Sequence, residues 1–178
     1  NHLFAMTQDE LSSWCESRGM KRFRARQILE WVYQHGEADP LNWTNLSARD
    51  RECAKAELTV ISGRTISHQL ATDGTQKLLI QWDDGDPQPS QSSSLNVLQD
   101  DPSLQTECVM IPALDDSVRK TACISSQVGC PVGCRFCASG LSGLDGNLSA
   151  GRIVEQAWRL GQLEGVGRIS NIVFMGMG

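Results

Sequence analysis

Four of the seven cysteines of this chain fall in one short stretch, which runs from Cys123 to Cys137. Three of them, Cys130, Cys134 and Cys137, have the spacing C-x3-C-x2-C. Thiolates are soft ligands that select iron–sulfur clusters, zinc or Cu(I). Because this spacing suits three thiolates wrapped around one small inorganic group, it predicts a metal site in this loop.

The sequence around the three cysteines favours one kind of metal. A structural zinc site usually has four protein ligands, often from paired C-x2-C units, but here one tight triple stands with no histidine near it. A [4Fe–4S] cluster is held by cysteine thiolates, and three cysteines would leave one of its irons free. We therefore favour an iron–sulfur cluster, with zinc or a disulfide network as alternatives. Gly129 and Gly133 would let the loop fold tightly, and Phe136 would shield one side of the cluster.

The string SSQVGC at 125–130, followed by PVGCRFC, places an aromatic residue directly before the last cysteine. This pattern resembles the cluster loop of radical S-adenosylmethionine (SAM) enzymes. With GNL at 146–148 and NIVFMGMG at 171–178, it is similar to one family among them, the RlmN/Cfr family, and more similar to its RlmN-type members. The resemblance is tight from about Thr121 to Gly178. It is looser before that, where KRFRARQILEWVYQHG at 21–36 is similar to an early helix of the family.

The resemblance implies a methyltransferase that modifies carbon 2 of adenine in 23S ribosomal RNA and, for RlmN-type members, in some transfer RNAs. It implies a [4Fe–4S] cluster, SAM bound at the free iron, and an electron donor such as flavodoxin or ferredoxin. Carbon 2 is electrophilic, so the family first loads a methyl group onto a second cysteine near the C-terminus of the complete protein. The protein orients the reactants while the cofactors carry the difficult chemistry, and the target adenine must be unstacked.

Two residues outside the loop match family positions with chemical roles. Glu107, in TECVMIP, matches a glutamate that accepts a proton, and Cys123 matches a cysteine that resolves the protein–RNA adduct. By itself, a carboxylate between apolar neighbours could have a raised pKa and act as a base, or it could simply face outward from a strand. For Cys123 the alternatives are an inward-facing barrel residue or an occasional fourth ligand.

A glycine pair follows the apolar run from Asn171 to Met175, which has the length of a buried parallel strand. Gly176 and Gly178 would then lie at the carboxyl edge of a parallel strand, where α/β folds bind ligands. The resemblance implies that this segment contacts SAM. At 144 and 146 the chain has Leu and Gly where the family commonly has Phe and Arg, so a possible phosphate or cluster-loop contact is missing here.

The hydrophobic pattern predicts an α/β fold that begins with a small helical module (1–62) and continues as a β-hairpin extension (63–118). The resemblance implies that the third region (119–178) is the first part of a radical-SAM partial (β/α) barrel. The hairpin carries an acidic, Ser/Pro-rich insertion at about 83–103. In the first region we expect helices at 8–18, 23–34 and about 48–58, with Thr7 and Glu10 forming a capping box. The apolar face of the second helix should comprise Phe23, Ile28, Trp31 and Val32. We interpret the chain as an incomplete N-terminal piece that would be inactive by itself.

The other expected elements are strands and one clear helix. We expect strands at 63–68, 77–82, 106–111, 120–125 and 171–175, with 77–82 and 106–111 paired as a hairpin. A helix should begin at Ser149 and should bury one face. That face comprises Ile153, Val154, Ala157, Trp158 and Gly161.

Charge and composition limit the partners and the compartment. The net charge of −5 gives no indication of RNA binding. However, five cations lie within residues 18–26, and this cluster is either a patch that contacts phosphate or a solvated helix face. They are Arg18, Lys21, Arg22, Arg24 and Arg26. We find no apolar run long enough for a membrane span and no leader sequence, and clustered cysteines fit a reducing compartment. We therefore expect a cytoplasmic monomer. The competing functions are another radical-SAM enzyme and a non-catalytic zinc module that binds nucleic acid.

Overall fold

The computed structural model describes residues 1–83, 104–113, 119–141 and 143–178. The chain forms two compact units, Asn1–Ile61 and Ser62–Gly178. The predicted acidic insertion at 83–103 lies outside the described residues except for Asp83. None of the helices in the described part of the chain is long and apolar enough to cross a membrane.

The N-terminal unit is helical, as predicted. Its elements are η1 (Leu3–Ala5), α1 (Gln8–Ser17), α2 (Arg24–Tyr33), η2 (Pro40–Asn42) and α3 (Ala48–Glu57). The predicted capping box is confirmed, because the Thr7 hydroxyl accepts from the Glu10 N–H while the Glu10 carboxylate accepts from the Thr7 N–H. Leu11, Ile28 and Trp43 are fully buried in this unit, so its fold rests on a compact apolar core.

Phe23 does not belong to the buried face that we expected for α2. Ile28 and Val32 are fully buried, whereas Phe23 is 53 % exposed at the helix start. Trp31 is half-buried and its indole N–H donates to the Asn45 side chain at 2.6 Å. The periodic pattern therefore located the core of the helix correctly but not its first turn, where an aromatic residue stays in contact with solvent.

The C-terminal unit is built on a five-stranded sheet with the order β1-β2-β3-β4-β7. The strands are β1 (Gly63–Leu70), β2 (Gln76–Trp82), β3 (Gln105–Pro112), β4 (Lys120–Cys123) and β7 (Asn171–Val173). The predicted hairpin is confirmed, since β2 and β3 pair antiparallel. β4 and β7 pair parallel and are connected through α4 (Ala150–Gly161), so β4, α4 and β7 form the expected β-α-β unit.

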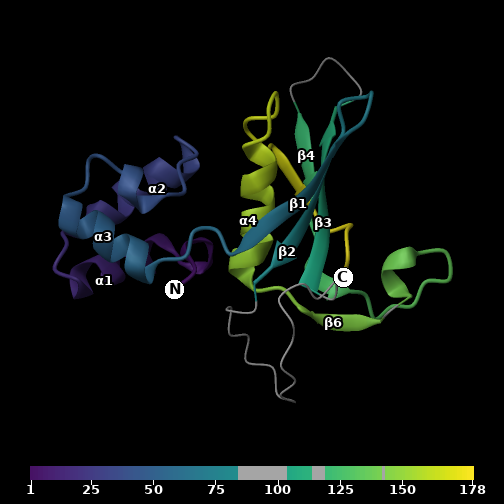
Figure 1. Cartoon of the computed structure of the whole chain (residues 1–178), viewed down its shortest axis with the longest axis horizontal. Helices are drawn as coiled ribbons and strands as arrows, with labels where there is room; N and C mark the ends of the chain where they lie inside the picture. The colour runs from purple at the N-terminus through teal and green to yellow at the C-terminus, as the bar shows by residue number, and fades with distance from the viewer. Residues whose placement is uncertain (84–103, 114–118, 142) are drawn as a thin grey trace. The chain divides into compact units, whose positions relative to one another are not determined.

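One face of the sheet packs against α4 (Figure 1). The core on this side contains Leu78 and Ile80 of β2, Met110 of β3 and Ala122 of β4, together with Leu160 of the helix. Side chains alternate between the two faces of a strand. The odd-numbered residues of β2 and β3 therefore point to the other face, where all of them except the buried Gln81 are half-buried or exposed.

The buried face of α4 is more polar than the sequence indicated. Ile153 and Ala157 pack against the core as expected, but Glu155 and Gln156 are fully buried. The Glu155 carboxylate accepts from the backbone N–H groups of Ser62 and Gly63 and pairs with Arg159. Backbone donors and a cation compensate the buried charge, and for this reason a hydrophobic pattern could not reveal this face.

A small second sheet was not predicted. It consists of β5 (Gln127–Gly129) and β6 (Leu144–Asn147), which pair antiparallel. Between them runs the cysteine loop with the short helix η4 (Ala138–Gly140). β6 and this loop extend away from the main sheet, on the side where the chain ends (Figure 1). The segment around Leu144 and Gly146, which departs from the family pattern, thus forms one strand of this hairpin.

Candidate functional site

The cysteine loop is closed at its base by the β5–β6 hairpin. The Cys130 N–H donates to the Gly143 carbonyl at 2.8 Å. Gly129 has φ +73°, and a Cβ at that position would overlap the Gly143 carbonyl oxygen. Only glycine fits both the backbone conformation and the space. The hairpin therefore fixes where the loop leaves and returns.

Within the loop, the three candidate ligands are free thiols. Cys134 is exposed, and Cys130 and Cys137 are partly exposed. The N–H of Ser139 donates to the Cys137 sulfur, which lowers the pKa of this thiol below its usual value. In the parts of the chain that the structure describes, no three His, Cys, Asp or Glu side chains are grouped closely enough to hold a metal ion. Phe136, expected to shield a cluster, is 94 % exposed.

The chemistry of this donor set fits an iron–sulfur cluster. All three candidate ligands, at 130, 134 and 137, are unpaired cysteines on one solvent-accessible loop. Iron–sulfur clusters are held by cysteine thiolates, and a cysteine with a lowered pKa is deprotonated more readily for ligation. The disulfide network that we kept as an alternative is not formed, since all seven cysteines are free.

Glu107 and Cys123 lie on the same face of the main sheet. Cys123 of β4 is paired with Val109 of β3, and Glu107 is two residues before Val109, so the three side chains share one face. This is the face opposite α4. The Glu107 carboxylate forms an ion pair with Lys77 of β2 at 2.9 Å, with side chains 44 % and 36 % exposed. The carboxylate is therefore held by a cation and open to solvent.

Cys108, the neighbour of Glu107 in β3, is directed to the opposite face. It is fully buried in the core under α4, and burial raises the pKa of its thiol to about 12. A thiol with so high a pKa is almost entirely protonated at neutral pH and is a poor ligand and nucleophile. The two adjacent residues Glu107 and Cys108 thus have opposite environments.

The Gly176–Gly178 segment lies against the start of the cysteine loop. The Met177 carbonyl accepts from the N–H groups of Ser126 and Gln127 at 2.9 and 3.1 Å. A Cβ on Gly176 would lie 2.5 Å from the Ser125 hydroxyl oxygen, and one on Gly178 would overlap the Ser126 hydroxyl. Both glycines are therefore needed for the close approach of these two segments. This contact places the proposed SAM segment beside the residues that lead into the cysteine loop.

Two polar residues at this junction could not be predicted as partners from the spacing of residues in the sequence. Ser125 is fully buried, and its hydroxyl donates to the Glu107 carbonyl at 2.8 Å and accepts from the Met177 N–H at 3.0 Å. Gln156 of α4 bonds both backbone groups of Ser125 at 2.9 Å each. Gln156 belongs to no motif, and although Ser125 is the first residue of the string SSQVGC, the meeting of the two residues depends on the tertiary fold.

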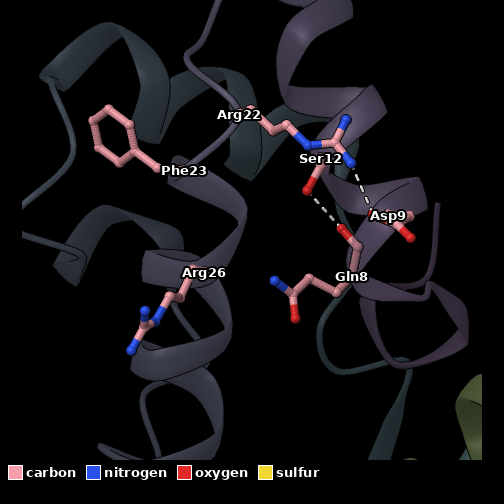
Figure 2. A pocket seen from close by; sticks show the side chains of 6 residues that line it. All are labelled: Gln8, Asp9, Ser12, Arg22, Phe23 and Arg26. Atoms are coloured by element: carbon pink, nitrogen blue, oxygen red, sulfur yellow. Dashed lines mark hydrogen bonds and ion pairs between the residues drawn. The ribbon is translucent and has the colours of Figure 1, made fainter.

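The N-terminal unit has a separate hollow of about 480 Å³ between α1 and α2. Six residues line it, which are Gln8, Asp9, Ser12, Arg22, Phe23 and Arg26. Figure 2 shows Arg22 turned toward Asp9, with which it pairs at 2.8 Å, and the Ser12 hydroxyl turned toward the Gln8 carbonyl. The hollow thus combines two arginines with a largely exposed aromatic ring.

The five predicted cations of this unit have different environments. Arg18 pairs with Glu57 at 2.7 Å, and the Arg24 guanidinium lies 5.1 Å from the centre of the Phe23 ring. Lys21, Arg24 and Arg26 form no ion pair among the described residues. The patch is therefore partly neutralised, and its free charge is concentrated at the start of α2.

The fold and this site define a class of protein. The structure matches a solved chain described as a radical SAM methyltransferase from Sphaerobacter thermophilus, with a TM-score of 0.81 and 33 % sequence identity over 99 % of this chain and 47 % of that one. Residues 1–60 match the family model described as the ribosomal RNA large subunit methyltransferase N-terminal domain.

Curated relatives make the similarity more specific. The chain is 37 % identical to the probable dual-specificity RNA methyltransferase RlmN of Rhodopirellula baltica, over 100 % of this chain and 43 % of the relative. It is 35 % identical to the dual-specificity RNA methyltransferase RlmN of Psychrobacter arcticus, over 99 % of this chain and 43 % of the relative. The chain is therefore similar to RlmN-type RNA methyltransferases, and it spans less than half the length of these relatives.

Proposed function

We propose that the protein containing this chain is a radical-SAM methyltransferase that methylates carbon 2 of an adenine in 23S ribosomal RNA, with transfer RNA as a second substrate. One observation carries the proposal most directly. The loop with three free thiols begins at the backbone segment that is hydrogen-bonded to Gly176–Gly178. A cluster on the thiols and a SAM molecule at the glycines would therefore be neighbours.

The chain offers residues for both cofactors. Cys130, Cys134 and Cys137 would hold a [4Fe–4S] cluster, and the backbone at Gly176 and Gly178 would meet SAM. When bound, the reduced cluster supplies the electron that cleaves SAM, with flavodoxin or ferredoxin as the proposed donor. The protein's own contribution is to position these groups and to keep the loop anchored on the β5–β6 hairpin.

Glu107 and Cys123 are proposed to act on the RNA from the sheet face opposite α4. Glu107 would accept a proton from the base, and its ion pair with Lys77 would hold the carboxylate in place. Cys123 would act later, as the thiol that releases the RNA from a methyl-carrying cysteine located outside this chain. Their shared face supports a joint role at one reacting centre.

The N-terminal unit supports the choice of RNA as substrate. α2 has no acidic residue in its first turn, and no described side chain caps it. Cations at a helix N-terminus are unfavourable with respect to the helix dipole, so Lys21 and Arg26 would be stabilised there by an anion. A phosphate would match this charge, and a base could stack on the exposed Phe23.

The proposal is tested by the metal content of the full-length protein after anaerobic reconstitution. We expect about four irons and about four sulfides per chain, as a [4Fe–4S] cluster requires. Cys134→Ala should abolish the cluster, whereas Cys53→Ala should retain it because this partly buried thiol lies in the N-terminal unit. One tightly bound zinc with no sulfide would instead support a non-catalytic zinc module.

A further inference from the structure

We propose that Ser125 is a positioning residue, held by Gln156, which fixes the Gly176–Gly178 segment for SAM binding. The inference rests on the proposed function, because it assigns the binding role of Gly176–Gly178 to SAM. The Gly176–Gly178 segment follows the last paired residue of β7, so contacts other than strand pairing must hold it in place. β4 ends at Cys123 and β7 at Val173, so the residues that follow need other contacts to stay in register.

The Ser125 hydroxyl joins three separate parts of the unit. It donates a hydrogen bond to the Glu107 carbonyl of β3 at 2.8 Å and accepts one from the Met177 N–H at 3.0 Å. Ser125 is fully buried, so water cannot readily replace these bonds. A single hydroxyl therefore links the backbone of the proposed base to the proposed SAM segment.

Gln156 fixes Ser125 in turn. Its side-chain oxygen accepts from the Ser125 N–H and its amide donates to the Ser125 carbonyl, both at 2.9 Å. Gln156 is also fully buried, and its amide has a further contact to the Arg152 carbonyl at 3.3 Å. The amide bonds the backbone of Ser125 as a neighbouring strand would, which holds the serine backbone rigid beyond the end of β4.

The glycine segment is shaped to fit this arrangement. A Cβ on Gly176 would lie 2.5 Å from the Ser125 hydroxyl oxygen and 3.0 Å from the Ile124 carbonyl oxygen. The close approach lets the Met177 N–H reach the Ser125 hydroxyl. Without the hydroxyl, the Met177 N–H and the Glu107 carbonyl would each lose this partner. Gly176–Gly178 would then no longer be held at a fixed distance from the sheet.

A matched control exists at the other end of the same strand pair. The Ser170 hydroxyl also forms two bonds, because it accepts from the Lys120 N–H at 3.0 Å and donates to the Lys120 carbonyl at 3.1 Å. Ser170 precedes β7, whereas the glycine segment follows it. Ser170→Ala therefore removes a pair of bonds between β4 and the residue that precedes β7, made by an exposed side chain, without touching the proposed SAM segment.

The test compares Ser125→Ala, Gln156→Met and Ser170→Ala with wild type in the full-length protein. Two quantities are measured, namely the SAM dissociation constant of the reconstituted protein and the hydrogen exchange of the Met177 amide. We expect Ser125→Ala to weaken SAM binding on the order of tenfold, the effect of losing one or two buried hydrogen bonds, and to speed exchange at Met177. Gln156→Met, which keeps the side-chain volume, should do the same, and Ser170→Ala should change neither quantity.

Two results would overturn the inference. One is wild-type SAM affinity in Ser125→Ala and Gln156→Met, even with faster exchange. The other is an equal loss of affinity in Ser170→Ala, which would mean that any loosening of β4 and β7 has the same effect. If wild type itself binds no SAM while the exchange of Met177 still depends on Ser125, the proposed function fails and the structural link stands. Gln156→Met keeps the test decisive if Ser125→Ala does not fold.

Discussion

The cysteines of this chain fall into two chemical kinds, set by their surroundings. Cys15 and Cys108 are fully buried, and burial raises the pKa of these thiols to about 11 and about 12. They stay protonated and inert at neutral pH. The loop cysteines are accessible, and the pKa of Cys137 is lowered by the Ser139 N–H. The C-x3-C-x2-C spacing alone distinguished the loop cysteines from the other cysteines, because the ligands of one metal centre must lie close together in sequence or in space.

The sequence did not predict contacts between side chains that are distant along the chain. The pairing of Glu107 with Lys77 depends on strand register, and that of Ser125 with Gln156 on helix placement. Phe23 was wrongly assigned to a buried face because the first turn of α2 lies at the edge of the core. None of these three cases has a local sequence signal.

The role of Cys123 can be tested by removing its thiol in the full-length protein. Cys123→Ala should keep the cluster, because Cys123 is outside the C-x3-C-x2-C unit, and should still cleave SAM. The RNA adduct could not be released, so a protein–RNA crosslink should accumulate as a slow-migrating band that nuclease collapses. Cys130→Ala should give neither crosslink nor product. If Cys123 is only structural, Cys123→Ala should lose roughly 1 kcal/mol of stability and turn over normally, without trapped RNA.

At the level of elements, the main sheet was predictable and the small one was not. The apolar residues of β2 and β3 indicated two strands that pair as a hairpin, and the apolar run of β7 indicated a parallel strand. β5 and β6 are three and four residues long, and their pairing depends on Gly129 and the return of the loop at Gly143. So short a hairpin has too few residues for a periodic signal.

The hairpin should be essential for the metal site. Gly129→Ala should strongly reduce the iron content of the reconstituted protein, because the new methyl group would overlap the Gly143 carbonyl oxygen and open the base of the loop. Gly133→Ala is the matched control. Gly133 also has positive φ, +66° against +73°, but a Cβ there meets nothing within 4 Å. It should bear only backbone strain of about 1 kcal/mol and retain most of the iron. Equal iron content in the two variants would contradict the role of the hairpin.

At the level of the whole molecule, two units carry complementary parts of the proposed activity. Asn1–Ile61 presents Arg26 and the exposed ring of Phe23 beside a hollow. Ser62–Gly178 presents the cysteine loop, the glycine segment and the sheet face with Glu107 and Cys123. The hydrophobic pattern did predict an α/β chain with a helical beginning. Composition did not predict a substrate, because the net charge of −5 does not show where the cations lie.

The most direct measurement is the chemical position of the methyl group in RNA treated with the full-length protein. The protein is reconstituted anaerobically, supplied with SAM and a reductant, and incubated with a 23S ribosomal RNA fragment. Its nucleosides are then analysed by mass spectrometry against standards. The account predicts 2-methyladenosine, absent when Cys130, Cys134 or Cys137 is replaced by Ala. Contradiction would come from a protein with intact cluster and SAM cleavage that leaves the RNA unmodified, or from a methyl group that still appears when the loop cysteines are gone.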